Sequence, residues 1–591
     1  MQFSIPGSRG RRVVVLGIAV AFVTALALSP LAGHAGAAPA RNATIIVPVR
    51  LIPTPPASMP VLRLKTIPPP TSFVNSVLPN VGAEQKQLVP LSQISFYAQH
   101  EFAPPANLVG AFHGSEHLAA FEDTKTGQAA VYPHLGGQTP VSAANVPSFL
   151  KRASSLAGTT FTGKKLIPRD STHYVLSPAV PLDGSTSTPT GGASPTKAYL
   201  AYVPVARKVG SYLVDGPGST SYMAFDTEMH VEGFMRNWKS GATFASAHET
   251  RSKTQIAKLI GSQLAALKPV NARVLTVSLA YYDSNKGYMQ PVYRFTAKVD
   301  YSAASGPVAS DFEVGYVGIG KRYEPIPALG TTVGSPPTDD NPGFPGAIPK
   351  RGAGPTDPCV GRYVVRNDDA NWVNSANGFY ANLSSFGGSG WFPNCQYYWG
   401  IQWQYNPTSP RVNSMNIVDS EGHGDWWLFS TLSNCCDLIN LNPAFSYGGD
   451  YKVLFPGYGA AAGGNLDYWI IHSCEVVPSP SDTANWYSMW WNLFGGLHSV
   501  MAYRTIMYIA DGAMAPYGLQ LRLGAPAVSS WLGTVISLGA YAGGPTMVMH
   551  GVTKHLGRPS TISMSSEVND TAYNTAAKPR ASSLTTFWYP G

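Results

Sequence analysis

The strongest constraint on the fold is an alternation of strand-like and helix-like segments between residues 360 and 510. Four apolar runs have the length and composition of strands, at 360–366, 411–420, 466–473 and 499–510. Strands that alternate with helices predict a largely parallel sheet covered by helices.

Two helices are expected between these strands, because apolar residues recur there at helical spacing. The first face is formed by Trp372, Ala376, Phe379, Tyr380 and Leu383. The second face, within 483–497, is formed by Trp486, Met489, Trp490, Leu493 and Leu497. Gly495 and Gly496 stand where the second helix would end.

The N-terminal half has a different pattern, typical of helices packed on antiparallel sheets. A helical face is expected at Ile256, Leu259, Ile260, Leu264 and Leu267, followed by two alternating strands joined by "SNKG". A similar short helix at 142–156 precedes further strand-like segments, and 183–196 is expected to be a loop. We therefore expect two α+β modules, at 101–240 and 241–324, after a Pro-rich segment at 38–100.

The chain begins with the features of an export signal. A basic stretch with Arg9, Arg11 and Arg12 precedes an apolar run, and "AGA" at 35–37 fits a cleavage site. We expect residues 1–37 to be removed and the protein to be secreted, to the extracellular space or a periplasm, without stable membrane insertion. A retained N-terminal anchor is the alternative.

Composition excludes some classes of partner. Charged residues make up 13% of the chain, against roughly 25% in an average soluble domain. The formal net charge is +8, but no basic run is present, so no nucleic acid partner is expected. A stretch at 325–358 is rich in proline and glycine and predicts a linker before a final domain at 359–591.

Two strand ends carry residues suited to thiol chemistry. One apolar strand runs into His423-Gly424, and a later one runs into Cys474, 51 positions further on. If these strands are parallel neighbours, both residues emerge at the same edge of the sheet. A thiolate that attacks a carbonyl and a histidine that manages protons are the parts of an acyl-transfer site.

This pair resembles the caspase/legumain/clostripain/gingipain superfamily of cysteine peptidases. The shared pattern is an apolar strand followed by His-Gly, and a later apolar strand followed by a small residue and Cys. "GHGDWW", the segment ending in Cys474 and "WNLFGGLHSVMAYRT" also look like an uncharacterised group of secreted bacterial proteins with this core. In the N-terminal half, "VARKVGSYLVDGPGS" and "LAYYDSNKGYMQPVYRF" are weakly similar to PepSY-type propeptide modules.

The resemblance implies a C-terminal α/β caspase-like domain, with a mostly parallel sheet flanked by helices, and a role for each site residue. Cys474 would be the nucleophile, and His423 would polarise the scissile carbonyl and protonate the leaving amine. The backbone N–H groups of Gly424 and Cys474 would form the oxyanion hole. Glu421 and Asp425 could orient His423. His472 and Ser473 would shape the wall of the site.

The expected function is therefore a secreted cysteine endopeptidase acting on protein or peptide substrates, without cofactor or metal, with the N-terminal half as a prodomain. The alternative is a non-catalytic secreted binding protein in which Cys474 is a buried apolar side chain and the N-terminal half an unrelated α+β binding domain. A zinc site made of His423, Cys435, Cys436 and Cys474 lacks the usual ligand spacing.

The five cysteines leave the disulfide pattern open. An odd number leaves at least one thiol, and Cys474 is the candidate. Cys359, Cys395, Cys435 and Cys436 allow three connectivities, although a bridge between the neighbours Cys435 and Cys436 is sterically awkward.

Overall fold

The structure is a computed structural model. It describes residues 43–100, 102–114, 117–189, 192–301, 309–330, 358–365, 370–385, 392–409, 411–431, 438–441, 451–452, 457–507, 514–538, 545–551, 569–574 and 578–589. The expected signal segment, most of the 325–358 linker, and Cys435 and Cys436 lie outside these residues. Residues 43–591 form one compact unit.

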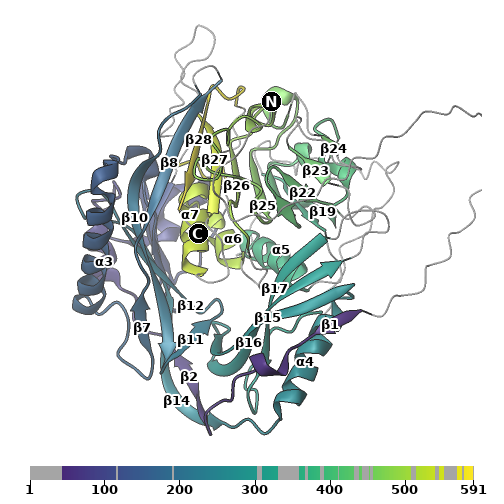
Figure 1. Ribbon diagram of the computed structural model, residues 1–591. Coiled ribbons are helices and arrows are strands. Elements are labelled where there is room, and N and C mark those ends of the chain that lie inside the picture. The colour runs from purple at the N-terminus through teal and green to yellow at the C-terminus, as the bar shows by residue number, and fades with distance from the viewer. Residues whose placement is uncertain are drawn as a thin grey trace, which may run out of the picture. The chain divides into compact units, whose positions relative to one another are not determined.

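Among the described residues, 24 strands form one continuous mixed sheet, and fifteen of them make a row that runs through both halves of the chain (Figure 1). In order along the row, its strands are β3 (Val89–Pro90), β4 (Leu108–His113), β5 (His117–Asp123), β6 (Ala129–Val131), β13 (Val231–Trp238), β12 (Ser219–Phe225), β10 (Lys197–Val209), β8 (Val180–Thr188), β28 (Ser583–Trp588), β27 (Pro545–Gly551), β26 (Ser499–Tyr503), β25 (Tyr468–His472), β20 (Ile417–Glu421), β18 (Val360–Val364) and β19 (Asn394–Trp399). The five strands from β26 to β19 are parallel, and every other pairing within this row is antiparallel. A parallel block is therefore present in the C-terminal half, but the whole sheet is mixed and richer in antiparallel pairs.

A second, mostly antiparallel part of the same sheet lies in the N-terminal half and joins the row through the pairing of β10 with β11. It contains β1 (Thr44–Ile46), β2 (Met59–Lys65), β11 (Tyr212–Asp215), β14 (Ser240–Ala247), β15 (Asn271–Asp283), β16 (Tyr288–Tyr301) and β17 (Ala309–Gly318). Two short strands, β7 (His173–Leu176) and β9 (Gly192–Ala193), extend β10 and β8. The antiparallel pair β15–β16 confirms the two strands expected around "SNKG".

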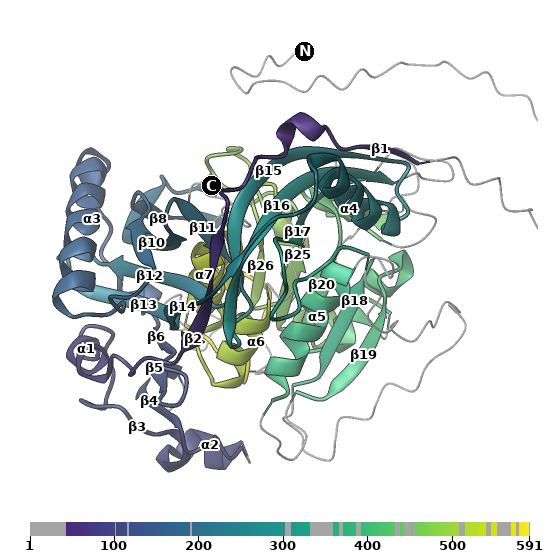
Figure 2. The ribbon, with the colours of Figure 1, turned by 90° about the horizontal axis from the view of Figure 1, so that it is seen from below.

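Each N-terminal sheet region has its own long helix, as the pattern predicts. Helix α3 (Val146–Gly163) buries four residues against β10, β12 and β13, and α4 (Lys253–Ala266) lies against β1 and β17 and shares a buried core with β15 and β16 (Figure 2). Ser252 and Gln255 form a capping box at the start of α4. Leu259 is 40% exposed, so its expected place on the buried face of this helix was wrong. The remaining N-terminal helices are short: α1 (Thr71–Val77) and α2 (Ser95–Gln99).

Much of the segment 183–196, expected to be a loop, forms strands: 183–188 end β8, and 192–193 form β9. Residues up to Thr188 belong to β8, which pairs with β28 over five residues from Asp183 to Ser187. The Thr186 and Thr585 hydroxyls hydrogen bond across this junction at 2.8 Å. Threonine is β-branched and suits a strand, whereas the abundance of small polar residues had suggested a turn.

Three helices cover one face of the parallel block. They are α5 (Ala370–Leu383), α6 (Ala515–Arg522) and α7 (Ala527–Leu538). Successive strand residues alternate between the two faces: Ile470 packs with these helices, whereas Trp469 and Ile471 pack in the core on the other face. Both faces are buried, which explains the nearly continuous apolar composition of these strands.

The helix expected at 483–497 is not formed. Backbone hydrogen bonds there close turns of three residues, as from Trp486 N–H to Thr483 and from Trp490 N–H to Tyr487, and only Trp490–Asn492 forms a 3₁₀ helix. Trp486, Trp490, Leu493 and Leu497 are nevertheless all buried. The spacing thus identified four core residues, whereas the fifth, Met489, is only half-buried, and consecutive tight turns rather than one helix bring them to the core.

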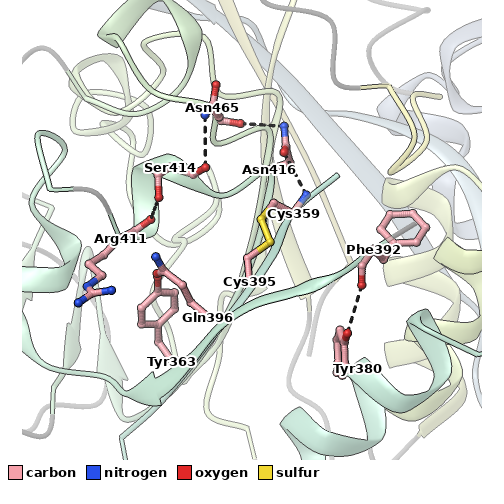
Figure 3. Close-up of a disulfide and its surroundings, with 10 residues drawn as sticks. All are labelled: Cys359, Tyr363, Tyr380, Phe392, Cys395, Gln396, Arg411, Ser414, Asn416 and Asn465. Atoms are coloured by element: carbon pink, nitrogen blue, oxygen red, sulfur yellow. Dashed lines mark hydrogen bonds between the residues drawn. A yellow bond between two sulfur atoms is a disulfide. The ribbon is translucent and has the colours of Figure 1, made fainter. Parts of the chain in front are cut away.

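A disulfide between Cys359 and Cys395 ties together the starts of β18 and β19 (Figure 3). The Cys359 N–H donates to the side chain of Asn416 at 3.1 Å, and the Asn416 amide donates to the Asn465 carbonyl at 3.3 Å. These contacts join the amino ends of three parallel strands, β18, β20 and β25. The predicted site residues lie at the opposite edge of the block, beyond the carboxyl ends of β20 and β25. No helix among the described residues is long and apolar enough to cross a membrane.

Candidate active site

The two strands that carry the predicted site residues are parallel neighbours. Strand β20 pairs with β25 over five residues, with Glu421 opposite His472. His423 follows the end of β20 by two residues, and Cys474 follows the end of β25 by two residues. Both therefore leave the sheet at its carboxyl edge, as expected from the sequence. This edge also lies beside the point where strand order reverses, because β19 and β20 lie on opposite sides of β18.

His423 is held at the start of a small hairpin formed by β21 (Gly424–Asp425) and β22 (Leu428–Ser430). Its backbone N–H donates to the Ser430 hydroxyl at 3.1 Å, and its carbonyl accepts the Ser430 N–H at 2.7 Å. The imidazole meets the ring of Trp372, in the first turn of α5, edge to face at a centroid distance of 6.0 Å. In the same small sheet, β22 also pairs with β23 (Leu438–Asn440), and β23 pairs with β24 (Tyr451–Lys452).

Gly424 brings the two strand ends into contact. A Cβ atom at this position would overlap the carbonyl oxygen of Cys474, the hydroxyl of Ser473 and a methyl group of Val476. Only glycine fits here without displacing backbone, so the residue after His423 permits a close approach of the two strand ends. The backbone it approaches is that of Cys474 itself.

Cys474 carries a half-buried thiol that faces the helix-covered side of the sheet. Its Sγ atom lies 3.4 Å from the Met507 N–H and 3.5 Å from the Met507 carbonyl oxygen. The next residue, Glu475, has φ of +56°, a left-handed conformation that is uncommon for a side chain of this type. The chain thus turns sharply at the thiol, and a strained backbone of this kind is often found at functional sites.

Glu421 pairs with His472. Its Oε2 atom lies 2.6 Å from Nδ1 of His472, and both side chains are fully buried. The Ser375 hydroxyl on α5 lies 3.2 Å from the same Nδ1 atom. Asp425 is exposed, and its carboxylate accepts the Trp426 N–H at 2.7 Å. The role of Glu421 and Asp425 as groups that orient His423 stays a prediction.

Burial controls the protonation of this cluster. Burial lowers the pKa of His472 to about 4, while the nearby Asp419 acts in the opposite direction. Burial and the neighbouring Glu421 raise the pKa of Asp419 well above its usual range. Burial raises the pKa of Tyr503, and the charges of Glu421 and Cys474 raise it further. Burial therefore favours the neutral forms of His472, Asp419 and Tyr503, which lie beneath the two strand ends.

Several of these residues were not predicted from the sequence. Sequence reasoning placed His472 in the site wall but did not pair it with Glu421, and it treated Trp372 only as a core residue of α5. Asp419 and Ser375 were not considered. The "DSE" run that closes an apolar strand at 419–421 was the available signal, because a fully buried strand has little reason to end in two acids.

Among the described residues, no group of three or more His, Cys, Asp or Glu side chains could hold a metal ion. Cys435 and Cys436, two members of the zinc alternative, lie outside them.

Comparison with known proteins adds a family match for the C-terminal half. Residues 360–588 match the model of a family described as "Domain of unknown function (DUF6345)", and this range runs from β18 to β28. No curated protein matches the sequence. Among solved structures, the chain is similar to an uncharacterized protein from Eubacterium rectale ATCC 33656, with 8% identity and a TM-score of 0.25. The similarity covers 45% of this chain and 87% of that one.

Proposed function

We propose that the protein is a secreted cysteine peptidase with a caspase-like core, in which His423 and Cys474 form the catalytic dyad. The observation that carries this proposal is the contact between the two strand ends, where Gly424 lies against the backbone of Cys474. Two residues 51 positions apart are thereby brought to one edge of a parallel sheet, in the order His-Gly then Cys that the resemblance requires.

The chemistry follows from this geometry. The Cys474 thiolate attacks the carbonyl carbon of a peptide bond, so that a C–S bond forms and negative charge develops on the carbonyl oxygen. The backbone N–H groups of Gly424 and Cys474 stabilise that oxygen. His423 donates a proton to the departing amine as the C–N bond breaks. Water then hydrolyses the thioester, which releases the acid and restores the thiol.

Secretion is part of the proposal and has one structural support. The Cys359–Cys395 disulfide is of the kind that persists in oxidising compartments and is rare in the cytosol. Together with the leader-like segment at 1–37, it favours an exported protein.

The N-terminal half contacts the same helix that carries Trp372. The side chain of Asn371 on α5 donates to the buried Glu313 on β17 at 3.2 Å. This contact supports a role for the N-terminal half in controlling the site, as a prodomain or an inhibitor.

A non-catalytic binding protein is the second candidate, and the thiol environment favours it. The Cys474 sulfur contacts both backbone polar groups of Met507, as a packed structural thiol would. A catalytic thiol would have to exchange these contacts for a substrate carbonyl.

Labelling with a peptide-based thiol electrophile separates the two candidates. The full-length protein is treated near neutral pH, and the modified residue is identified by mass spectrometry. Selective modification of Cys474, slowed in a His423→Ala variant, is expected of the peptidase. Cleavage of a peptide library that continues unchanged in Cys474→Ala would show that the catalytic assignment is wrong.

A further inference from the structure

We propose that Glu421 and His472 form a positioning pair that tunes the reactivity of Cys474 and the placement of His423. This inference rests on the proposed function, since it adds two residues to the same site. The pair lies on the helix-covered face of the sheet, directly below the carboxyl ends of β20 and β25.

The geometry of the pair determines the tautomer of His472. A carboxylate oxygen 2.6 Å from Nδ1 accepts the N–H of that nitrogen, so the neutral ring keeps its lone pair on Nε2. The burial that holds the pKa of His472 near 4 keeps the ring neutral at physiological pH. Glu421 on β20 is thus a carboxylate that orients His472 on the adjacent strand β25.

Two aromatic rings connect His472 to the dyad. The ring of Trp372 lies 6.1 Å from His472 and 6.0 Å from His423, nearly perpendicular to both. The ring of Tyr503 lies 5.6 Å from His472 and within electrostatic reach of both Glu421 and Cys474. A rotation of His472 would therefore displace the supports of both His423 and Cys474.

Asp419 is a second observation that points to function rather than stability. This carboxyl group is fully buried, and neither of its oxygens has a hydrogen-bond partner among the described residues. An unsatisfied buried carboxyl group lowers stability, and such groups gather at functional sites. Asp419 shares its strand with Glu421 and acts on the pKa of His472.

The chain supplies a matched control at the opposite edge of the sheet. His498 and Asp467 form another buried pair, with Nε2 and Oδ1 3.2 Å apart. His498 directly precedes β26, and Asp467 directly precedes β25. This pair therefore lies at the amino ends of the strands, at the edge of the sheet opposite the site. If buried histidine–carboxylate pairs only stabilise the sheet, the two pairs should behave alike.

The test is the rate at which iodoacetamide alkylates Cys474 in the full-length protein, measured from pH 5 to 9, with unfolding by urea as a parallel measurement. Glu421→Gln is expected to slow alkylation at pH 7 by about tenfold or more and to shift its pH profile, within the range that proton-handling groups contribute. Asp467→Asn is expected to lower stability but to leave the alkylation profile within about twofold of the wild type. Ser375→Ala, a milder change at the same Nδ1 atom, should act in the direction of Glu421→Gln and serves if that variant fails to fold.

Peptide hydrolysis is followed in the same samples, so that the two proposals can fail separately. Glu421-dependent alkylation without any hydrolysis would retain the positioning pair and reject the peptidase. Hydrolysis with normal alkylation in Glu421→Gln and Ser375→Ala would retain the peptidase and reject the pair. Equal effects of Glu421→Gln and Asp467→Asn, or no alkylation of folded wild-type protein, would also overturn the inference.

Discussion

Gly424 leaves no room for a side chain, because an added Cβ atom would overlap the backbone of Cys474. We expect Gly424→Ala to destabilise the protein by about 1–3 kcal/mol, as overpacking does, because the new methyl group must displace the backbone of Cys474. Electrophile labelling of Cys474 should fall at the same time. Gly163→Ala at the end of α3 is the control, since nothing lies within 4 Å of its added methyl group. Wild-type labelling in Gly424→Ala would contradict the close approach.

Arg207 is the residue whose loss should damage the N-terminal half most. Its buried guanidinium lies 3.4 Å from Asp283 and 3.7 Å from Asp170, and it stacks on Trp238 at 4.7 Å. Arg207→Met would leave the fully buried Asp283 without its main cation, and we expect a loss of about 3–5 kcal/mol in urea unfolding.

The control for Arg207 is an ion pair of the same charge type at the surface. Lys298 and Asp300 are 3.2 Å apart but partly exposed, so Lys298→Met should cost less than about 1 kcal/mol. Similar losses for the two variants would show that the Arg207 network is not worth more than a surface pair.

At the residue scale, the sequence predicted the residues that come just after strands and missed those that pack beneath them. His423, Gly424 and Cys474 could be found because each stands just beyond an apolar run. The partners Trp372 and Ser375 belong to α5, and their contact with His472 depends on how that helix lies on the sheet. No local pattern contains that information.

At the scale of elements, periodic patterns identified most helices and strands. Two predictions were wrong: the helix at 483–497, and the loop at 183–196 that includes part of β8. The helix at 483–497 failed because indole rings can reach one core from tight turns as well as from a helix. The strand β8 was missed because serine, threonine and glycine are common in loops. Its partner β28 lies about 400 positions away, and only the pairing shows why threonines occur on both strands.

The junction of β8 and β28 should hold the two halves together after cleavage. We expect a protein cut at a protease site inserted within 331–357 to remain one particle in size-exclusion chromatography, since the sheet and the core continue across the halves. A prodomain in this fold would thus stay bound when the linker is cut.

Thr586→Pro provides the matched variant for this experiment. Strand β28 is paired on both edges, so a proline in its interior removes a ladder hydrogen bond and should weaken the junction. The cut variant should then separate into fragments more readily than the cut wild type. Separation of the cut wild type in native buffer would contradict the role of the junction.

At the scale of the whole molecule, buried titratable groups act on stability in opposite directions. Burial lowers the pKa to about 4 in His100, His117, His134 and His472. These groups are neutral in the fold but take up protons near pH 6.5 when unfolded, so they reduce stability as the pH falls below 6.5. Burial, and then the carboxylate of Asp226, raises the pKa of Glu232 to about 8, so its contribution is present at low pH and lost as the pH rises from about 4.5 to 8.

Glu232→Gln should therefore change the pH dependence of unfolding. The amide cannot ionise, so the stability of this variant relative to the wild type, measured as the free energy required for unfolding, should be higher at pH 8 than at pH 5. Urea titrations at the two values measure the difference. An equal stability difference between Glu232→Gln and the wild type at pH 5 and pH 8 would contradict this expectation.

The sequence predicted two differently built halves, but it did not predict that one sheet and one core run through both of them. Helix-on-sheet packing in the N-terminal half and the parallel block in the C-terminal half follow from local periodicity. The joining of both halves into one sheet and one core depends on contacts such as that of Thr186 with Thr585, which are too distant in sequence to be recognised from one chain. The division into domains stays a prediction.

The disulfide and the free thiol lie at opposite edges of one sheet, and they require opposite redox states. We therefore expect Cys474 to react best over a limited range of redox potential. The Cys359–Cys395 bridge must be oxidised to clamp the amino ends of β18 and β19, a constraint worth about 4 kcal/mol in the chain-entropy model for a separation of 36 residues. Cys474, at the other edge, must be reduced to react. Labelling of Cys474 in glutathione buffers of graded potential should therefore rise and then fall, with its maximum between full oxidation and full reduction.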